Sequence, residues 1–258
     1  MMNEKEIRAL EKRASDGWPG LVIEEYDGWQ LRFAKGYTGR ANSTSHFGES
    51  KRAVKEVIAY CEEQYAKRGL PCNFKVTDAD QTLTEALKDR GYKTITPTDV
   101  MILDVKDEAF SSVENGWRED PGVQFVYGTA HNDNGWIKDY FALEGIHDEQ
   151  KQAVYEKIHS SVKAEKLYIK IIAEEKTVGV ASCAIEEGYS LLQNVIIDPA
   201  FRGQGLGKRL CMAAILKSRE MGATYFYLQV LQDNEVAISL YKKLGYKKAY
   251  AYCYMRNA

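Results

Sequence analysis

Hydrophobic residues recur with two different periods along this chain of 258 residues. Apolar side chains recur every three or four residues in some stretches, as at Val54, Val57 and Ile58, and every second residue in others, as over 28–34. The period of three to four residues predicts helices over 3–15, 53–67, 83–90, 205–221 and 235–244, with further helical pieces between 134 and 163. The period of two residues, together with short apolar runs between turn residues, predicts strands over 28–34, 73–77, 100–105, 123–127, 167–174, 178–186, 191–197, 224–231 and 249–255.

A polar stretch with glycine and proline, 106–122, divides this pattern into two halves. We place a domain boundary there, giving domains of residues 1–115 and 116–258. A faint repeat supports two related halves, because 87–93 and 241–247 share Lys, Gly, Tyr and Lys and each ends a helix at glycine. Helix ends alone can produce such a match. Strands followed by helices predict an α/β fold, mixed with α+β features.

Composition removes several classes of protein from consideration. The 35 Lys and Arg residues nearly balance the 37 Asp and Glu residues, so the net charge of −2 argues against a nucleic-acid partner. No apolar run approaches the ~18 residues of a membrane helix, and the N-terminus carries charge where a signal peptide needs apolar residues. Five cysteines and four histidines show no zinc-site spacing. We expect a cytoplasmic protein with reduced thiols, no metal and no membrane partner.

The most informative stretch joins a predicted strand to a predicted helix and reads VIIDPAFRGQGLGK over 195–208. It turns at an Asp-Pro pair and enters the helix through Gly203, Gly205 and Gly207. Glycine lets the backbone approach a ligand closely, and successive N–H groups at a helix start point toward an anion. Lys208 adds positive charge at the same end. The spacing fits neither the Rossmann nor the Walker pattern, and an ordinary tight turn is the alternative.

An R-x-x-G-x-G pattern that begins at Arg202, after an apolar strand ending in Asp-Pro, resembles the pyrophosphate loop of the GNAT acyltransferase superfamily. In that family an Asn and, seven residues later, a Tyr follow before a Leu-Gly-Tyr ending, as Asn234 and Tyr241 do here. The match covers about 167–256. It implies two GNAT-like domains, each a mixed sheet flanked by helices, of which 116–258 binds acetyl-CoA and the first is degenerate.

The resemblance also implies which residues bind acetyl-CoA. The backbone of the strand at Val195, Ile196 and Ile197 would pair with the pantetheine arm like an added strand. The loop that would hold the pyrophosphate comprises Arg202, Gly203, Gln204, Gly205, Leu206, Gly207 and Lys208. Asn234 would bond to the cofactor arm.

For Tyr241 the resemblance implies the catalytic role of protonating the departing thiolate. The alternative is that Tyr241 only packs against the core. The helical spacing predicts a buried stripe of Val236, Leu240 and Leu244, with Tyr241 one residue off the stripe, at its edge. That position suits a hydroxyl directed into a cleft.

The general base is not evident from the resemblance. Relatives that acetylate the N-termini of ribosomal proteins have Glu five residues before the Asn, where this chain has Gln229, an amide that cannot accept the proton. A second common position falls at Gln193 and Asn194. Other carboxylates could serve, and a water chain remains equally open; the candidates are Glu144, Asp148, Glu186 and Glu187.

The N-terminal half resembles the degenerate first domain of tandem GNAT proteins through residues 27–32 and 36–43. It has no R-x-x-G-x-G pattern, and Leu87 stands where Tyr241 stands in the second half. Arg32, Arg40 and Asn42 either line an acceptor pocket or tie their loop down through hydrogen bonds to backbone; the sequence leaves both readings open.

Together these observations predict an acetyl-CoA-dependent N-acetyltransferase that moves the acetyl group directly to a primary amine of a small molecule or peptide. No cysteine stands out as an acyl carrier, so we expect no covalent intermediate. A non-catalytic acyl-CoA-binding or sensing module is the alternative, which Gln229 favours and the presence of both Asn234 and Tyr241 opposes. The acceptor and the oligomeric state are not specified by the sequence.

Overall fold

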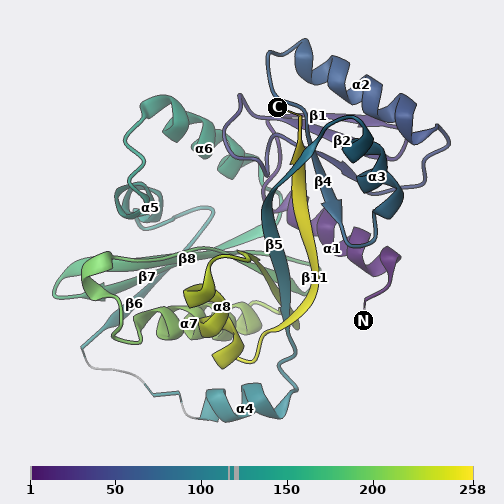
Figure 1. The fold of residues 1–258 in the computed structure, drawn as a ribbon. Helices are drawn as coiled ribbons and strands as arrows, with labels where there is room; N and C mark the ends of the chain where they lie inside the picture. Colours follow the sequence, from purple (N-terminus) through teal and green to yellow (C-terminus); the bar gives the residue numbers. More distant parts are fainter. Residues whose placement is uncertain (1, 116, 119–121, 258) are drawn as a thin grey trace. The chain divides into compact units, whose positions relative to one another are not determined.

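The computed structural model describes residues 2–115, 117–118 and 122–257 (Figure 1). The chain divides into two compact units. Unit 1 consists of Met1–Asp99, Ala153–Lys163 and Ala249–Ala258, and unit 2 of Val100–Gln152 and Ala164–Lys248. The predicted boundary between residues 115 and 116 falls at a residue outside the described ones, and it stays a prediction.

Unit 1 is built on a mixed sheet. Its strands are β1 (Val22–Tyr26), β2 (Trp29–Phe33), β3 (Thr44–His46) and β4 (Asn73–Thr77), with parts of β5 (Lys93–Leu103) and β11 (Lys247–Arg256). Its helices are α1 (Glu4–Asp16), α2 (Val54–Ala66) and α3 (Gln81–Asp89), with most of α6 (Glu149–Ser161). Strand β3 runs parallel to β4, and the pairs β1–β2, β2–β3 and β4–β11 are antiparallel. The hydrophobic pattern did not predict β1 or the short polar strand β3, which lies between the elements predicted over 28–34 and 53–67.

The two faces of this sheet differ in polarity because neighbouring side chains of a strand point to opposite faces. Leu31 of β2 and Phe74 of β4 belong to an apolar core with residues of α2 and α3. Arg32, which is next to Leu31, instead donates to Ser15 of α1. Helix α1 therefore covers a polar face, and α2 and α3 cover the apolar one.

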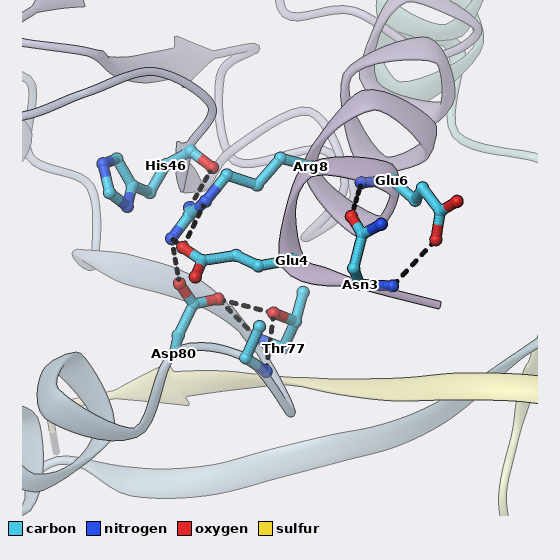
Figure 2. Close-up of polar contacts among 8 residues, drawn as sticks. Asn3, Glu4, Glu6, Arg8, His46, Thr77 and Asp80 are labelled. Atoms are coloured by element: carbon cyan, nitrogen blue, oxygen red, sulfur yellow. Dashed lines mark hydrogen bonds and ion pairs between the residues drawn. The ribbon is translucent and has the colours of Figure 1, made fainter. Parts of the chain in front are cut away.

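Helix α1 is fixed at its start and along its exposed side (Figure 2). Its capping box joins Asn3 and Glu6 through bonds of 2.8 and 3.0 Å, which satisfy two backbone donors. Further along, Arg8 donates to the carbonyl oxygen of His46 at 2.9 Å and to the carboxylate of Asp80 at 3.3 Å (Figure 2). These bonds hold the helix against β3 and against the connection from β4 to α3.

Unit 2 is also a mixed sheet flanked by helices. Its strands are β6 (Gln124–Thr129), β7 (Glu165–Ala173), β8 (Lys176–Glu186), β9 (Tyr189–Ile197), β10 (Tyr225–Leu231) and part of β5 (Lys93–Leu103). Its helices are α4 (Glu108–Asn115), α5 (Trp136–Glu144), the first residues of α6 (Glu149–Ser161), α7 (Leu206–Glu220) and α8 (Glu235–Lys243), with a 3-10 turn at Pro199–Phe201. Strands β6 to β9 are antiparallel neighbours, and β10 runs parallel to β9.

Helix α7 covers one face of the unit 2 sheet and α5 the other (Figure 1). Leu210 and Ala214 of α7 are buried in an apolar core with Ile169 and Leu192 of the sheet. Both units thus confirm the predicted α/β class, with mixed sheets flanked by helices. Helix α4 was not predicted, since it lies in the stretch expected to be a polar linker. Among the described helices, none is both long and apolar enough to cross a membrane.

Candidate active site

Strands β9 and β10 separate in the middle of the unit 2 sheet. Their parallel pairing runs from Tyr189 and Tyr225 to Leu192 and Leu228 and is not continued beyond that point. The other edge of β9 stays paired with β8 as far as Ile197. From residue 193 onward, the edge of β9 that faced β10 therefore has no strand partner in the described part of the chain. Such an edge can pair with an extended ligand.

A β-bulge lies where the two strands separate. Asn194 and Val195 of β9 stand opposite the single residue Ala181 of β8. Asn194 has a left-handed φ of 55°, which Asn tolerates better than most residues. The indole Nε1 of Trp136 on α5 donates to the carbonyl oxygens of Ala181 at 2.8 Å and Ile169 at 3.1 Å. Neither the bulge nor the role of Trp136 was predicted from the sequence, where an Asn inside an apolar strand is the one signal of the bulge.

The loop that follows β9 is shaped by its glycines. Asp198 caps the 3-10 turn by accepting from the N–H of Ala200 at 2.9 Å. Gly203 and Gly205 then have φ values of 78° and 77°, a region that disfavours other residues. A Cβ atom at either position would meet nothing within 4 Å. The backbone conformation requires both glycines, and the space beside them is open.

The backbone amides of this loop have no acceptor. From Gly203 to Lys208, no N–H group donates a hydrogen bond within the described residues, and the helical bonds of α7 begin with Arg209 N to Gly205 O at 3.2 Å. Unpaired N–H groups at a helix start carry partial positive charge, which attracts an anion. Arg202 uses its Nε to donate to Ile197 O at 3.1 Å, which leaves its exposed Nη groups available. The arrangement is an open oxyanion cradle.

Gly207 has a different structural reason from Gly205. A Cβ atom there would lie 3.1 Å from Cδ1 of Leu240 on α8 and 3.8 Å from Cγ1 of Ile197 on β9. The first of these distances is too short for an ordinary contact. Gly207 therefore allows α7 to pack closely against α8, while Gly205 leaves room beside the loop.

Asn234 stands at the start of α8 and caps it. Its Oδ1 accepts from the N–H of Ala237 at 3.1 Å, which satisfies one donor of the first turn. Its Nδ2 has no acceptor in the described part of the chain and is exposed. The side chain can therefore cap the helix and donate to a ligand at the same time.

Tyr241 is the central buried residue of α8, with 8% of its surface exposed. The predicted stripe is wrong at Val236, which is 83% exposed; the inward face is formed by Ala237, Tyr241 and Leu244 at positions i, i+4 and i+7. The Tyr241 ring packs edge-on against Tyr246 at a centroid distance of 5.9 Å. Burial raises the pKa of Tyr241 well above its ordinary value, so the hydroxyl stays protonated. That hydroxyl has no hydrogen-bond partner among the described residues.

The positions expected for a base hold amides. Gln193, at the bulge, is 5% exposed, and neither its amide oxygen nor its amide nitrogen has a hydrogen-bond partner in the described structure. Glu186 pairs with Tyr189 at the start of β9, about 17 Å of strand away from Asn194. Asp148 caps α6 by accepting from two backbone N–H groups, at 2.9 and 3.1 Å. Across the described residues, no group of three or more His, Cys, Asp and Glu side chains could hold a metal.

The three residues expected beside an acceptor all lie in unit 1. Arg32 is 2% exposed and bonds to serine hydroxyls and a carbonyl oxygen. Asn42 accepts from the N–H groups of Ala34 and Gly36 and donates to two carbonyl oxygens, which favours the loop-tying reading. The Arg40 guanidinium lies over the Trp18 ring at 4.9 Å.

Comparison with known proteins agrees with this geometry. Residues 4–255 match the family described as "Probable histone acetyltransferase Rv0428c C-terminal". The chain is 26% identical over 249 residues to the "Uncharacterized N-acetyltransferase YobR" of Bacillus subtilis, covering 93% of this chain and 94% of that one.

Two solved structures show the same fold. A GCN5-related N-acetyltransferase from Kribbella flavida matches with a TM-score of 0.72 and 16% identity, covering all of this chain and 96% of that one. A tandem GNAT protein from the clavulanic acid biosynthesis pathway matches with a TM-score of 0.70 and 13% identity, covering 89% of this chain and 77% of that one.

The chain belongs to the Rv0428c C-terminal acetyltransferase family and, through it, to the GNAT superfamily of acyltransferases. The resemblance drawn from the two sequence motifs is confirmed. The family match extends over both halves of the chain.

Proposed function

We propose that the protein transfers the acetyl group of acetyl-CoA to a primary amine of a small molecule or peptide, at the site built by β9, β10, α7 and α8. The observation that carries this proposal is the run of unpaired amides from Gly203 to Lys208 beside the free edge of β9. A pyrophosphate supplies the acceptors that these amides lack, and a pantetheine arm, which has amide groups of its own, pairs with the free strand edge.

The residues of the site divide this task. The backbone of Val195, Ile196 and Ile197 offers the free strand edge to the pantetheine arm. The amides of 203–208 bind the pyrophosphate, with Arg202 and Lys208 adding positive charge; this set includes Gly203, Gln204, Gly205, Leu206 and Gly207. Asn234 donates to the cofactor arm through the Nδ2 that capping leaves unused.

The transfer needs one proton acceptor and one proton donor. The neutral amine attacks the thioester carbonyl, forming the C–N bond, and loses a proton as the C–S bond breaks. Tyr241 remains protonated because it is buried, so its hydroxyl can donate to the departing thiolate. Gln193 and Gln229 cannot take a proton, and we assign the amine proton to a water molecule, with Glu144 and Glu187 as the carboxylates still open. Holding both substrates side by side supplies the proximity term.

The remaining expectations extend this proposal to the whole protein. It acts in the cytoplasm on a soluble amine, without a metal, a nucleic acid or a membrane. Arg40 is available to orient an acceptor, whereas Arg32 is buried and bonded to serines, and the polar atoms of Asn42 already bond to backbone.

Release of the CoA thiol, measured with a panel of primary amines, tests the proposal. We expect release that depends on the amine, and a wild-type protein that is stabilised by acetyl-CoA against heat. Acetyl-CoA binding without release for any amine would instead indicate the sensing module. No stabilisation by acetyl-CoA and no release would contradict both functions.

A further inference from the structure

The sheet face of unit 1 that lies under α1 is a buried polar layer. Its buried polar residues are Gln30, Arg32, Ser43, Ser45, Asn73 and Lys75. Strand pairing places them together, since Gln30 pairs with Ser45 and Lys75 pairs with Tyr254 of β11. A buried polar layer costs stability unless its groups satisfy one another. The partners of each charge in the layer therefore show whether the layer is complete.

The charge of Lys75 is satisfied within the layer. Its ammonium pairs with the carboxylate of Glu11 on α1, and both side chains are buried. Glu11 also accepts from the hydroxyl of Tyr250 at 2.7 Å, and the Lys75 ammonium lies 3.7 Å from the centre of the Tyr252 ring. This pair contributes no net charge.

The charge of Arg32 has only neutral partners. Its guanidinium donates to the hydroxyls of Ser15 at 2.6 Å and of Ser43 and Ser45 at 2.9 Å each, and its Nε donates to the Ser43 carbonyl oxygen at 3.3 Å. Arg8, in the same unit, pairs instead with two carboxylates (Figure 2). Buried arginines are ordinarily paired with a negative charge, so Arg32 gives the layer an excess of positive charge.

Arg40 adds a second unbalanced charge above this layer. It is half-buried over the Trp18 ring and has neither a carboxylate nor a hydrogen-bond acceptor among the described residues. The Tyr254 ring lies below the same loop, 3.8 Å from where a Cβ of Gly39 would be. The hydroxyl of Tyr254 is fully buried without a hydrogen-bond partner among the residues described. Arg32 and Arg40 both lie close enough to oppose the rise that burial causes in the pKa of Tyr254.

The guanidinium groups of Arg32 and Arg40 thus both lie close to Tyr254, whose ring packs under Gly39 of the loop 36–42. All of these groups donate hydrogen bonds, and no described carboxylate balances Arg32 or Arg40. We propose that this place in unit 1 binds the oxyanion of a small molecule, a carboxylate or phosphate group, with Arg40 donating to it directly. Arg32, whose guanidinium is held by three serines, stabilises the negative charge from below without contacting it.

Trp18 reports on this site directly. Its indole Nε1 donates to the Thr38 hydroxyl at 3.0 Å, and its ring contacts Arg40. We expect its indole N–H resonance, assigned by Trp18→Phe, to shift saturably when the full protein is titrated with glutarate or inorganic phosphate. The uncharged glutaramide, and chloride at matched ionic strength, should leave the resonance in place. Absence of a saturable shift with both oxyanions would overturn the proposal.

Variants separate the site from general charge effects. Arg40→Met keeps a long side chain over Trp18 but removes the guanidinium, and we expect it to weaken oxyanion binding by about tenfold or more. Arg68→Met is the matched control, because Arg68 also lies over an aromatic ring, Phe33 at 4.1 Å, but is paired with Glu24. Unchanged binding in Arg40→Met, or an equal loss in Arg68→Met, would contradict the assignment.

The oxyanion could belong to the amine acceptor or to a separate molecule, and kinetics distinguish these sources. If the acceptor carries it, Arg40→Met raises KM for an amine with a carboxylate far more than for the same amine as its amide. If a separate molecule carries it, Arg40→Met changes the two KM values equally while glutarate binding is still lost. Both results support the site, and the binding measurements do not depend on transferase activity.

Discussion

The turns that lead into α2 of unit 1 and α7 of unit 2 both present backbone amides at the start of a helix. In unit 1 the amides of Lys51 and Arg52 donate to the carboxylate of Asp27 at 3.0 and 2.8 Å, and the Ser50 hydroxyl donates to it at 2.6 Å. These bonds, that of Ser50 first, hold the pKa of Asp27 below its ordinary value. In unit 2 the amides of 203–208 have no acceptor within the described residues.

The turn of unit 1 is thus closed by an internal contact, whereas the turn of unit 2 leaves its amides open, as the proposed acetyl-CoA site requires. In unit 1 an internal carboxylate, that of Asp27, accepts from the amides just before the helix. The later helix repeats the contrast, since Leu87 of α3 is fully buried and apolar where Tyr241 of α8 carries a hydroxyl. Unit 1 has a mixed sheet flanked by helices, but its turn lacks the open amides and its helix lacks a tyrosine at this position.

Closing the open turn should have the largest effect. We expect Gly205→Val to abolish stabilisation by acetyl-CoA, which for the wild type is about 2.7 kcal/mol at ~100 times the dissociation constant. The new side chain enters the space that the ligand needs. Thermal unfolding with and without acetyl-CoA measures this.

Gly222→Val is the matched control for that variant. Gly222 ends α7 with a φ of 92°, and a Cβ atom there, as at Gly205, would meet nothing within 4 Å. The backbone strain is therefore similar, but the site lies at the other end of the helix. Stabilisation by acetyl-CoA that persists in Gly205→Val, or that is lost equally in Gly222→Val, would show that the amides do not hold the ligand.

Removing the hydroxyl of Tyr241, the proposed proton donor, should have the next largest effect, which is a loss of turnover. We expect Tyr241→Phe to lower kcat by about 10²-fold, near the lower end for general acid–base assistance, with acetyl-CoA affinity unchanged. Tyr246→Phe is the control, since its buried hydroxyl also lacks a described partner and its ring contacts Tyr241. That control should keep kcat and stabilise the fold by roughly 1 kcal/mol. A Tyr241→Phe enzyme with near-full turnover would exclude the acid role.

Local sequence patterns predicted the parts of this site that follow from spacing along the chain. The glycine loop, α7 and the order of Asn234 and Tyr241 lie within continuous segments, so their periodicity and spacing are visible. Val236 was misjudged because apolar character alone does not show which helix face is inward. Its exposure depends on how α8 packs against α7 through Gly207 and Leu240.

Features that depend on tertiary pairing could not be predicted in the same way. The bulge at Asn194 exists only in the register with β8, and Trp136 reaches it from a helix more than forty residues earlier in the chain. Asp27 fills the turn of unit 1 from 23 to 25 residues away. The positions of these residues in the sequence carry no periodic signal for either contact.

Activity should not fall at mildly alkaline pH through deprotonation of Tyr241. Its raised pKa keeps the hydroxyl protonated beyond the ordinary value of about 10, so donation continues across neutral and mildly alkaline pH. We expect kcat/KM to rise with pH as more of the acceptor amine becomes neutral, and the slope should be the same in wild type and Tyr241→Phe. A falling limb present only in the wild type would contradict the burial argument.

Opening the turn before α2 by removing the Asp27 carboxylate should have the smallest effect on stability and none on acetyl-CoA binding. Asp27→Ala frees the amides of Lys51 and Arg52. The variant still has no glycine loop in this turn, and α3 still carries Leu87. We expect a small loss of thermal stability that the wild type also shows at acidic pH, once the pH falls through the lowered pKa of Asp27. Acetyl-CoA should not bind unit 1 in this variant. A second acetyl-CoA site in Asp27→Ala would show that the carboxylate alone closes unit 1.

Titration calorimetry of the full chain with acetyl-CoA tests the contrast between the two units most directly. The open amides lie in the turn before α7, and the corresponding turn of unit 1 is filled by Asp27. We therefore expect one acetyl-CoA per chain, with binding lost in Gly205→Val and retained in Gly222→Val. Two acetyl-CoA molecules per chain, or one molecule that still binds Gly205→Val with wild-type affinity, would contradict the account.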